Sequence, residues 1–134
     1  MIRAVLDTNV IVSGILSEQG PPGWIVDLVA AGELAAVYDA RILAEYRDVL
    51  TRSRLNLNAT RVQLLLDIIQ NSGIPVTPMP WQAPLPDPAD EAFIACAKMA
   101  VAPLATGNLR HYPEHLRFDV IVLTPRQFLD KLRA

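Results

Sequence analysis

The feature that most constrains the fold is a short apolar run, Ile2 to Leu6, that stops at the carboxylate of Asp7. A run rich in Ile, Val and Leu is typical of a strand buried on both faces, as in the parallel sheets of α/β proteins. In open α/β sheets, ligands bind in the crevice beyond the carboxyl ends of the strands. The sequence therefore predicts a buried strand that places Asp7 at the edge where such proteins carry their sites.

Strand-like and helical patterns alternate through the rest of the chain. After a polar interruption that follows Asp7, short strands are predicted at residues 34–38, 74–77, 103–106 and 120–123. Helices are predicted behind the proline pair at 21–22, from the N-cap Asp39 to 50, from 58 or 60 to 72, over 87–99, and from Pro125 onward. The proline-rich stretch 78–88 is predicted to be a loop. This alternation indicates a doubly wound α/β domain with helices on both faces of a parallel sheet.

The composition favours one globular domain. With 134 residues, 51% of them hydrophobic, the chain is long enough for one compact core and too short for two, so residues 1–134 are expected to form one domain. No apolar run approaches the roughly 18 residues of a membrane span, and we expect a cytoplasmic protein without a membrane partner. Cys96 is the one cysteine, which excludes an intramolecular disulfide, and its apolar neighbours indicate a buried hydrophobe rather than a reactive thiol.

The formal net charge of -2 argues against a protein that coats nucleic acid nonspecifically. It does not exclude a nuclease, because a bound cation reverses the local effect of the acids that hold it. A local basic run in the middle of the chain is compatible with a nucleic-acid patch or, more simply, with a solvated helical face; it consists of Arg47, Arg52, Arg54 and Arg61.

Polar side chains follow the predicted strands and begin the predicted helices. Asp7 follows the first strand, Glu45 lies in the second turn of a helix, Asp90 lies at a helix start, and Asn108 follows a later strand. A parallel topology brings such positions together at one edge of the sheet. Hard divalent cations need oxygen ligands, and Mg²⁺ uses one or two carboxylates while leaving room for water and a phosphate oxygen. Together these residues indicate a metal-dependent site.

Each of these residues also has a purely structural interpretation. Asp7 is compatible with a polar turn that closes a strand. Glu45 is placed for a surface ion pair with Arg41 one turn earlier, worth about 0.3 to 0.5 kcal/mol. Asp87 and Asp90 are acids in a helical first turn, where the helix macrodipole favours them without any function. Only the coincidence of acids at strand ends raises the functional interpretation above these alternatives.

Four segments of the chain combine into a recognisable pattern. They are residues 5–10 (VLDTNV), 43–50 (LAEYRDVL), 86–97 (PDPADEAFIACA) and 105–112 (ATGNLRHY). In their order and spacing, these segments resemble the PIN-domain family, in particular its branch of toxin components related to the VapC-type ribonucleases. The resemblance spans almost the whole chain and is more specific than any single motif.

The resemblance implies a single three-layer α/β/α sandwich with a central parallel sheet of about five strands. It implies an endoribonuclease that depends on Mg²⁺ or Mn²⁺ and that acts as the toxin of a type II toxin-antitoxin pair. The implied partners are an RNA substrate, a small antitoxin protein, and a second copy of the chain in a homodimer.

The resemblance also assigns site residues by position. The family's acidic catalytic and metal-binding set matches three residues, Asp7, Glu45 and Asp90. Four further residues match or neighbour supporting positions, namely Asn9, Asp87, Thr106 and Asn108. Asn108 stands where many family members carry a fourth Asp. This departure removes one charge and puts a second metal ion in doubt, although an amide oxygen is still able to ligate a metal.

Two other functional classes compete with a nuclease. Phosphotransferases of the haloacid dehalogenase type also begin with a strand ending in Asp, but they need a second acid two residues later, where this chain has Asn9. The stronger rival is a PIN fold kept as an RNA- or protein-binding module, with catalysis weakened by Asn108. His111, a single histidine in a loop, is interpreted as a polar surface residue outside the catalytic set. Which RNA would be cleaved is not encoded in these motifs.

Overall fold

Five parallel strands within residues 2–133, the part of the chain that the computed structural model describes, form one sheet in the order β3-β2-β1-β4-β5. The strands are β1 (Ile2–Leu6), β2 (Leu34–Tyr38), β3 (Ile74–Pro75), β4 (Leu104–Ala105) and β5 (Val122–Leu123). β1 lies at the centre of the sheet. The chain order reverses between β1 and β4, and such a switch point is where doubly wound sheets bind their ligands.

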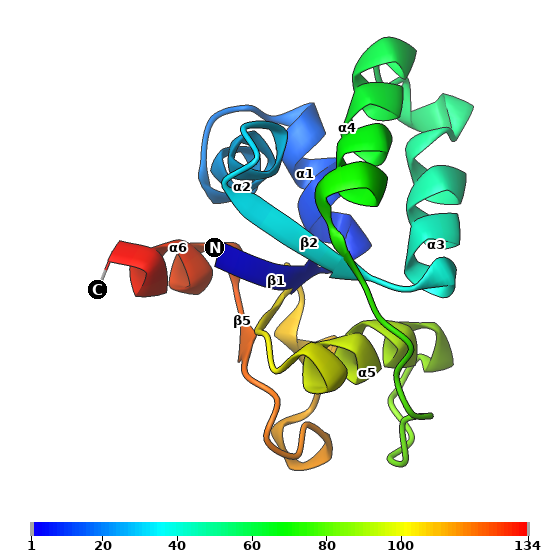
Figure 1. Cartoon of the computed structure of the whole chain (residues 1–134), viewed down its shortest axis with the longest axis vertical. Coiled ribbons are helices and arrows are strands. Elements are labelled where there is room, and N and C mark those ends of the chain that lie inside the picture. Colours follow the sequence, from blue (N-terminus) through cyan, green and yellow to red (C-terminus); the bar gives the residue numbers. More distant parts are fainter. Residues whose placement is uncertain (1, 134) are drawn as a thin grey trace.

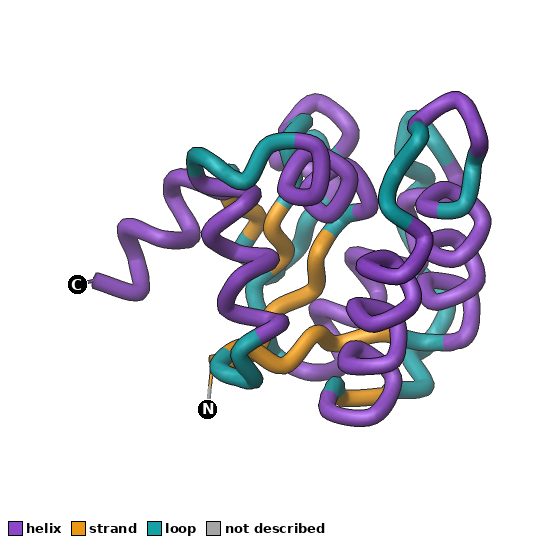
Figure 2. The backbone as a smooth tube through the Cα atoms, turned by 90° about the horizontal axis from the view of Figure 1, so that it is seen from above, coloured by secondary structure: helices purple, strands orange, loops and turns teal. Residues whose placement is uncertain are grey.

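Within the same residues, six α-helices cover the sheet. They are α1 (Thr8–Leu16), α2 (Pro21–Ala30), α3 (Ala40–Leu50), α4 (Ala59–Ser72), α5 (Glu91–Ala100) and α6 (Pro125–Arg133). Helices α1 to α4 lie on one side of the sheet and α5 on the other (Figure 1), and Figure 2 shows the strands enclosed by helices. The predicted three-layer α/β/α sandwich is confirmed. None of these helices has the length and apolar character needed to cross a membrane.

Side-chain caps set the starts of three helices. Asp39 accepts a hydrogen bond at 3.0 Å from the backbone three residues later, as predicted for the N-cap of α3, and Asn58 caps α4 in the same way. At α6, the Thr124 hydroxyl accepts from the N–H of Gln127, whose side chain accepts from the N–H of Thr124, which forms a capping box. These contacts involve residues only three apart, which is why the sequence predicts where these helices begin.

The polar interruption predicted after Asp7 is wrong, because helix α1 begins directly at Thr8. Its sequence, TNVIVSGIL, is rich in β-branched residues and contains a glycine, which both lower helix propensity. The helix packs against α2 and α3, so apolar residues occupy most of its positions and no polar stripe marks it. Gly14 permits the close packing, since a Cβ there would lie 2.5 Å from Cγ2 of Val26 on α2.

Several predicted boundaries differ from the structure. The strands predicted over 74–77 and 103–106 are shorter, at Ile74–Pro75 and Leu104–Ala105. The helix predicted over residues 87–99 is a 3₁₀ turn, Pro88–Asp90, followed by α5 from Glu91. The turn is tight because Asp87 caps it through a side-chain hydrogen bond and Pro88 begins it. The strand predicted over 120–123 pairs with β4 only at Val122 and Leu123. The prediction that the proline-containing β3 lies at an edge of the sheet is confirmed.

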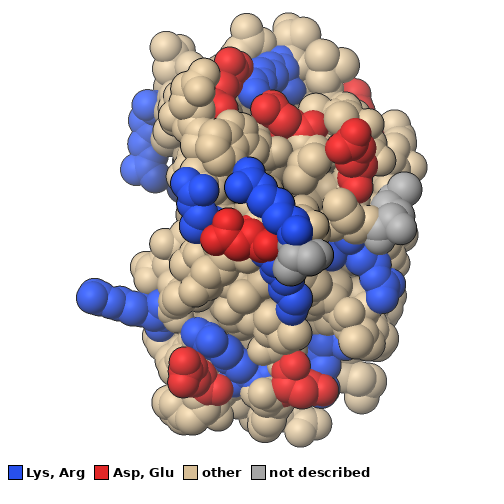
Figure 3. All heavy atoms as spheres, turned by 90° about the vertical axis from the view of Figure 1, so that its left-hand side faces the viewer, with Lys and Arg blue, Asp and Glu red and all other residues tan. Residues whose placement is uncertain are grey.

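Acidic and basic side chains are mixed on one face of the molecule. On the face that carries α6, they alternate instead of forming patches of one sign (Figure 3). In the central basic run, Arg52 pairs with Asp48 at 2.8 Å and Arg61 pairs with Glu18 at 2.7 Å. Part of that run is therefore neutralised locally, which favours the interpretation as a solvated face.

Candidate active site

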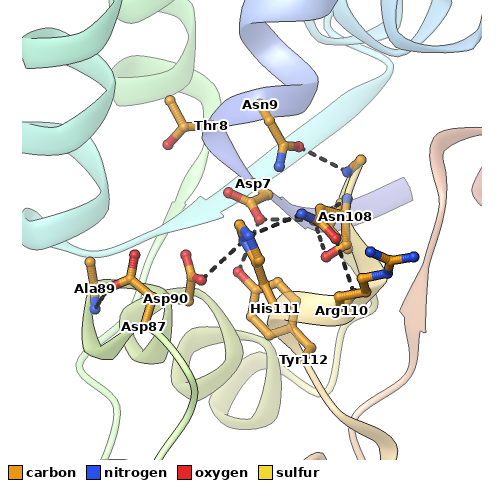
Figure 4. Close-up of polar contacts among 12 residues, drawn as sticks. Asp7, Thr8, Asn9, Asp87, Ala89, Asp90, Asn108, Arg110, His111 and Tyr112 are labelled. Carbon is orange, nitrogen blue, oxygen red and sulfur yellow. Dashed lines mark hydrogen bonds and ion pairs between the residues drawn. The ribbon is translucent and has the colours of Figure 1, made fainter.

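Asp7 is buried at the carboxyl end of β1, with 4% of its surface exposed. Because Leu6 pairs with Ala105 in the β1–β4 register, Asp7 lies beside Thr106, the residue that follows β4. The Thr106 hydroxyl donates to Oδ2 of Asp7 at 2.9 Å, and the Tyr112 phenol donates to the same oxygen at 3.0 Å. Asp7 occupies the N-cap position of α1, but its side chain does not cap the helix. Its carboxylate belongs to the polar cluster at the end of the sheet (Figure 4).

Asp90 brings a second buried carboxylate to this cluster. It ends the turn before α5 and is 8% exposed. Its Oδ2 is fully buried and has no hydrogen-bond partner among the described residues. Nδ1 of His111 lies 3.3 Å from this oxygen, a distance that allows an ion pair when the imidazole is protonated, but the two are not aligned as a hydrogen bond. One potential ligand atom from each of Asp7, Asp90 and His111 lies within 4.8 Å of the other two.

Asn108 links the loop after β4 to His111 (Figure 4). Its Oδ1 accepts from the N–H of Arg110 at 3.1 Å, and its Nδ2 lies 3.0 Å from Nε2 of His111. The backbone N–H of Asn108 donates to the Thr106 hydroxyl at 3.1 Å, so the same hydroxyl connects this loop to Asp7. Both polar ends of the Asn108 amide are therefore used within the protein.

Glu45 lies on α3, and its contacts differ from those expected from the sequence. The ion pair expected between Glu45 and Arg41 is not formed, because Arg41 pairs with Asp39 at 2.7 Å. Glu45 is half-buried and accepts a hydrogen bond from the Thr8 hydroxyl at the start of α1. Its carboxylate lies outside the three-residue group above, but its negative charge contributes to raising the pKa of Asp90.

The remaining predicted supporting residues hold the loops that carry the cluster. Asn9 accepts a hydrogen bond from the N–H of Gly107 at 2.9 Å, which fastens the start of α1 to the loop after β4. Asp87 is exposed and accepts from the N–H of Ala89 at 3.0 Å, so it caps the turn that presents Asp90. Figure 4 shows Asp87 at the outer side of this turn.

The environment of the two buried carboxylates opposes their charge. Burial raises the pKa of Asp7, while the hydrogen bonds from Thr106 and Tyr112 partly offset this increase. Burial, followed by the negative charge of Asp7, raises the pKa of Asp90 to about 7, and His111 acts in the opposite direction. Two desolvated carboxylates, one of them with a buried oxygen that lacks a partner, fit a divalent cation that takes oxygen ligands.

The structure adds two side chains to the candidate site, Tyr112 and His111. Tyr112 is completely buried and donates to Asp7, and His111 lies between Asp90 and Asn108. Both belong to the segment 105–112 that carries part of the family resemblance, which is the one sequence feature that points to them. Neither has a pattern of its own that predicts a role, because their contacts depend on how the loop after β4 folds back over β1.

The chain also matches known proteins. Its sequence matches the PIN domain over residues 3–110. The uncharacterized protein MJ1680 of Methanocaldococcus jannaschii is 27% identical over 141 aligned residues, which cover 97% of this chain and 91% of that protein. FitAcB from Neisseria gonorrhoeae has a similar fold, with a TM-score of 0.56, 21% identity, and coverage of 92% of this chain and 98% of that chain. FitAB bound to the IR36 DNA fragment gives a TM-score of 0.51 and 22% identity, over 91% and 94% of the two chains.

The chain belongs to the PIN domain family. PIN domains are generally nucleases, which are hydrolases, and PIN nucleases generally use divalent metals. The cluster around Asp7 and Asp90 has the donor chemistry that such an ion requires.

Proposed function

We propose that this protein is a metal-dependent endoribonuclease that hydrolyses RNA phosphodiester bonds with Mg²⁺ or Mn²⁺. The observation that carries the proposal is the buried Oδ2 of Asp90, which has no hydrogen-bond partner among the described residues and lies next to the buried carboxylate of Asp7. An unpaired, desolvated carboxylate destabilises a fold unless a ligand compensates it. A cation held between the carboxylates of Asp7 and Asp90 is the simplest compensation.

Asp7 and Asp90 are the residues that would hold the ion, with Glu45 contributing directly or through water. When bound, a divalent ion neutralises charge on the scissile phosphate and acidifies water for hydrolysis. Thr106 and Tyr112 favour the ionised form of Asp7, since both donate to its carboxylate. Water is the nucleophile, so the chain needs no nucleophilic side chain, and in-line displacement leaves a 5′-phosphate and a 3′-hydroxyl.

Asn108 favours a second candidate, a PIN fold that binds RNA or protein with weakened catalysis. Its amide carries no charge and both of its polar ends are engaged, so it does not replace a fourth acid. Metal binding measured by calorimetry, together with cleavage of a labelled RNA, separates the two candidates. A module that has lost catalysis would bind Mg²⁺ or RNA without cleaving the RNA, whereas the proposed enzyme does both.

The decisive experiment is cleavage of an end-labelled single-stranded RNA by the full chain, first in chelator and then with Mg²⁺ or Mn²⁺ restored. A DNA of the same sequence serves as the comparison substrate. We expect internal cleavage of RNA only when metal is present. Asp90→Asn should abolish cleavage, and Asp48→Asn should not, because Asp48 is an exposed carboxylate of α3 that pairs with Arg52. Cleavage in chelator, or by Asp90→Asn at the parental rate, would contradict the proposal.

We also propose that the chain is the toxin of a type II pair, that a small antitoxin binds it, and that it forms a homodimer. The sequence resemblance to the toxin branch supports this, as does a fold shared with FitAcB and with FitAB, whose structure was determined on a DNA fragment. Expression of the chain alone should arrest growth, and Asp7→Asn should remove the arrest. Co-expression of a small protein from the neighbouring reading frame should restore growth of cells that express the unchanged chain. Arrest that persists with Asp7→Asn would contradict the toxin assignment.

A further inference from the structure

The contacts of Asn108 determine which nitrogen of His111 carries the proton. Oδ1 of Asn108 accepts from the N–H of Arg110 at 3.1 Å, and this bond fixes the orientation of the amide. The other end, Nδ2, lies 3.0 Å from Nε2 of His111. An amide nitrogen only donates, so Nε2 must accept. In the neutral imidazole, the proton therefore lies on Nδ1.

The protonated nitrogen faces the carboxylate cluster. Nδ1 of His111 lies 3.3 Å from Oδ2 of Asp90, the buried oxygen without a hydrogen-bond partner in the described residues. A small rotation of the carboxylate would align the two as a hydrogen bond, and the second lone pair of the oxygen would stay open to a cation. A nitrogen that carries a proton has no lone pair for a metal ion, although its position among Asp7 and Asp90 is that of a potential ligand.

We infer that Asn108 holds His111 in the tautomer protonated on Nδ1 and that His111 is thereby a positioning residue, which directs its Nδ1–H toward Asp90 and is not itself a metal ligand. The role of Asp90 as a ligand rests on the proposed function, whereas the tautomer does not. The residue at position 108 then decides what the imidazole does. An Asp there would accept from Nε2–H and turn the Nδ1 lone pair toward the cluster, as in carboxylate–histidine–metal arrangements.

The tautomer is measured by NMR on the ¹⁵N-labelled full chain without metal, at a pH where the imidazoles are neutral. The chain has two histidines, and His115→Gln assigns the signals, because His115 is exposed in a separate turn. We expect a protonated Nδ1 and an unprotonated Nε2 in His111 of the parent, and the reverse in Asn108→Asp. A protonated Nε2 in the parent, or no change in Asn108→Asp, would overturn the inference. Neither result depends on nuclease activity, so this test stands apart from that of the proposed function.

The positioning role is measured by Mn²⁺ and Mg²⁺ affinity and by pulsed EPR of bound Mn²⁺. His111→Ala should weaken metal binding by about 10-fold, in the range found for residues that hydrogen-bond to metal ligands. His115→Ala should not change it. His111→Asn places an amide nitrogen near the position of Nδ1 and should recover most of the affinity. The parent should show no directly bound nitrogen by EPR, and Asn108→Asp should show one. Directly bound nitrogen in the parent, or equal affinities of the parent and a folded His111→Ala, would refute the role.

Discussion

The phenol of Tyr112 donates a hydrogen bond to Oδ2 of Asp7 at 3.0 Å, although the two residues are 105 positions apart in the chain. Tyr112 is completely buried, and its neighbours Asp7 and Asp90 add to the effect of burial in raising the pKa of its hydroxyl. The hydroxyl is therefore a permanent donor at neutral pH. Together with Thr106, it gives Oδ2 two donors and stabilises the charged form of a carboxylate whose burial opposes that charge.

Tyr112→Phe should weaken metal binding and RNA cleavage by about 10- to 100-fold. It removes one of the two hydrogen-bond donors that orient the Asp7 carboxylate and favour its ionised form. Tyr38→Phe is the matched control. It removes a hydroxyl that donates to the carbonyl of Gln70 on α4, outside the cluster. Calorimetry with Mg²⁺ and the RNA cleavage assay measure both effects. Equal losses in the two variants would mean that the Tyr112 hydroxyl contributes only to the fold.

Asp7→Asn should reduce RNA cleavage by more than about 100-fold while leaving the fold intact, because the proposed ligand loses its charge. The amide oxygen can still accept from Thr106 and Tyr112, so the buried contacts survive. Since burial disfavours the Asp7 carboxylate, its replacement should also raise the melting temperature of the metal-free protein. Circular dichroism and thermal unfolding in chelator check this. A folded variant with full Mg²⁺-dependent cleavage would remove Asp7 from the site.

The metal-free protein should become less stable as the pH rises from about 4 to about 7. Burial and the charge of Asp7 raise the folded-state pKa of Asp90 to about 7, above its value of about 3.9 in an unfolded chain. In that window the folded state binds more protons than the unfolded state, so the free energy of unfolding falls with rising pH. The raised pKa of Asp7 acts in the same direction.

Urea unfolding in chelator, followed across this pH range, measures the effect. Asp90→Asn should flatten the dependence, and saturating Mg²⁺ should recover stability at the upper end, because a ligand that binds only the folded state stabilises it. Asp48→Asn, on the exposed face of α3, is the control and should retain the parental slope. A parent whose stability does not change over the window would show that these carboxylates ionise without penalty.

Asn108→Asp should tighten Mn²⁺ and Mg²⁺ binding and lower the stability of the metal-free protein near neutral pH. The added carboxylate attracts the cation, but without metal it repels Asp7 and Asp90. Its hydrogen bond from the N–H of Arg110 should be kept, so the loop conformation is preserved. Calorimetry and thermal unfolding with and without metal must show both effects. Parental values for metal affinity and for metal-free stability would place position 108 outside the site.

The proposed homodimer should appear in sedimentation velocity, and Phe118→Asn should shift it toward the monomer. Phe118 is 62% exposed and lies against Trp81 in a tilted arrangement, with 5.3 Å between ring centroids, and the exposed Met79 and Met99 line the same pocket. Phe118 has a φ of 51°, a left-handed conformation that Asn tolerates better than Phe, so the substitution should not destabilise the monomer. Trp24 is 38% exposed on α2, whereas Trp81 is only partly exposed. The effect of replacing Trp24 is compared with that of Phe118→Asn. A parent that sediments only as a monomer at tens of micromolar would contradict dimerisation.

Local signals in the sequence determined most of the architecture. These signals affect only residues that are close to them in the sequence. They are the apolar run before Asp7, the caps Asp39, Asn58 and Thr124, and the proline in β3. Strand burial, helix starts and the edge position of β3 can therefore be predicted without knowledge of the tertiary structure. The same holds for the positions of Asp7 and Asp90, because strand ends and helix starts are local properties and a parallel topology places them at one edge.

Contacts between distant segments decided the rest. Helix α1 has weak propensity and owes its form to packing against α2 and α3, so no local pattern marks it. Glu45 accepts from Thr8 at the start of α1, while Arg41, its expected partner one turn earlier, pairs with Asp39. His111 and Tyr112 belong to the site only because of the path of the loop after β4. The hydrogen bond from Tyr112 to Asp7 and the 3.3 Å contact of His111 with Asp90 both depend on the β1–β4 register. A sequence shows which groups are present near a strand end, but the register and loop path set which of them touch.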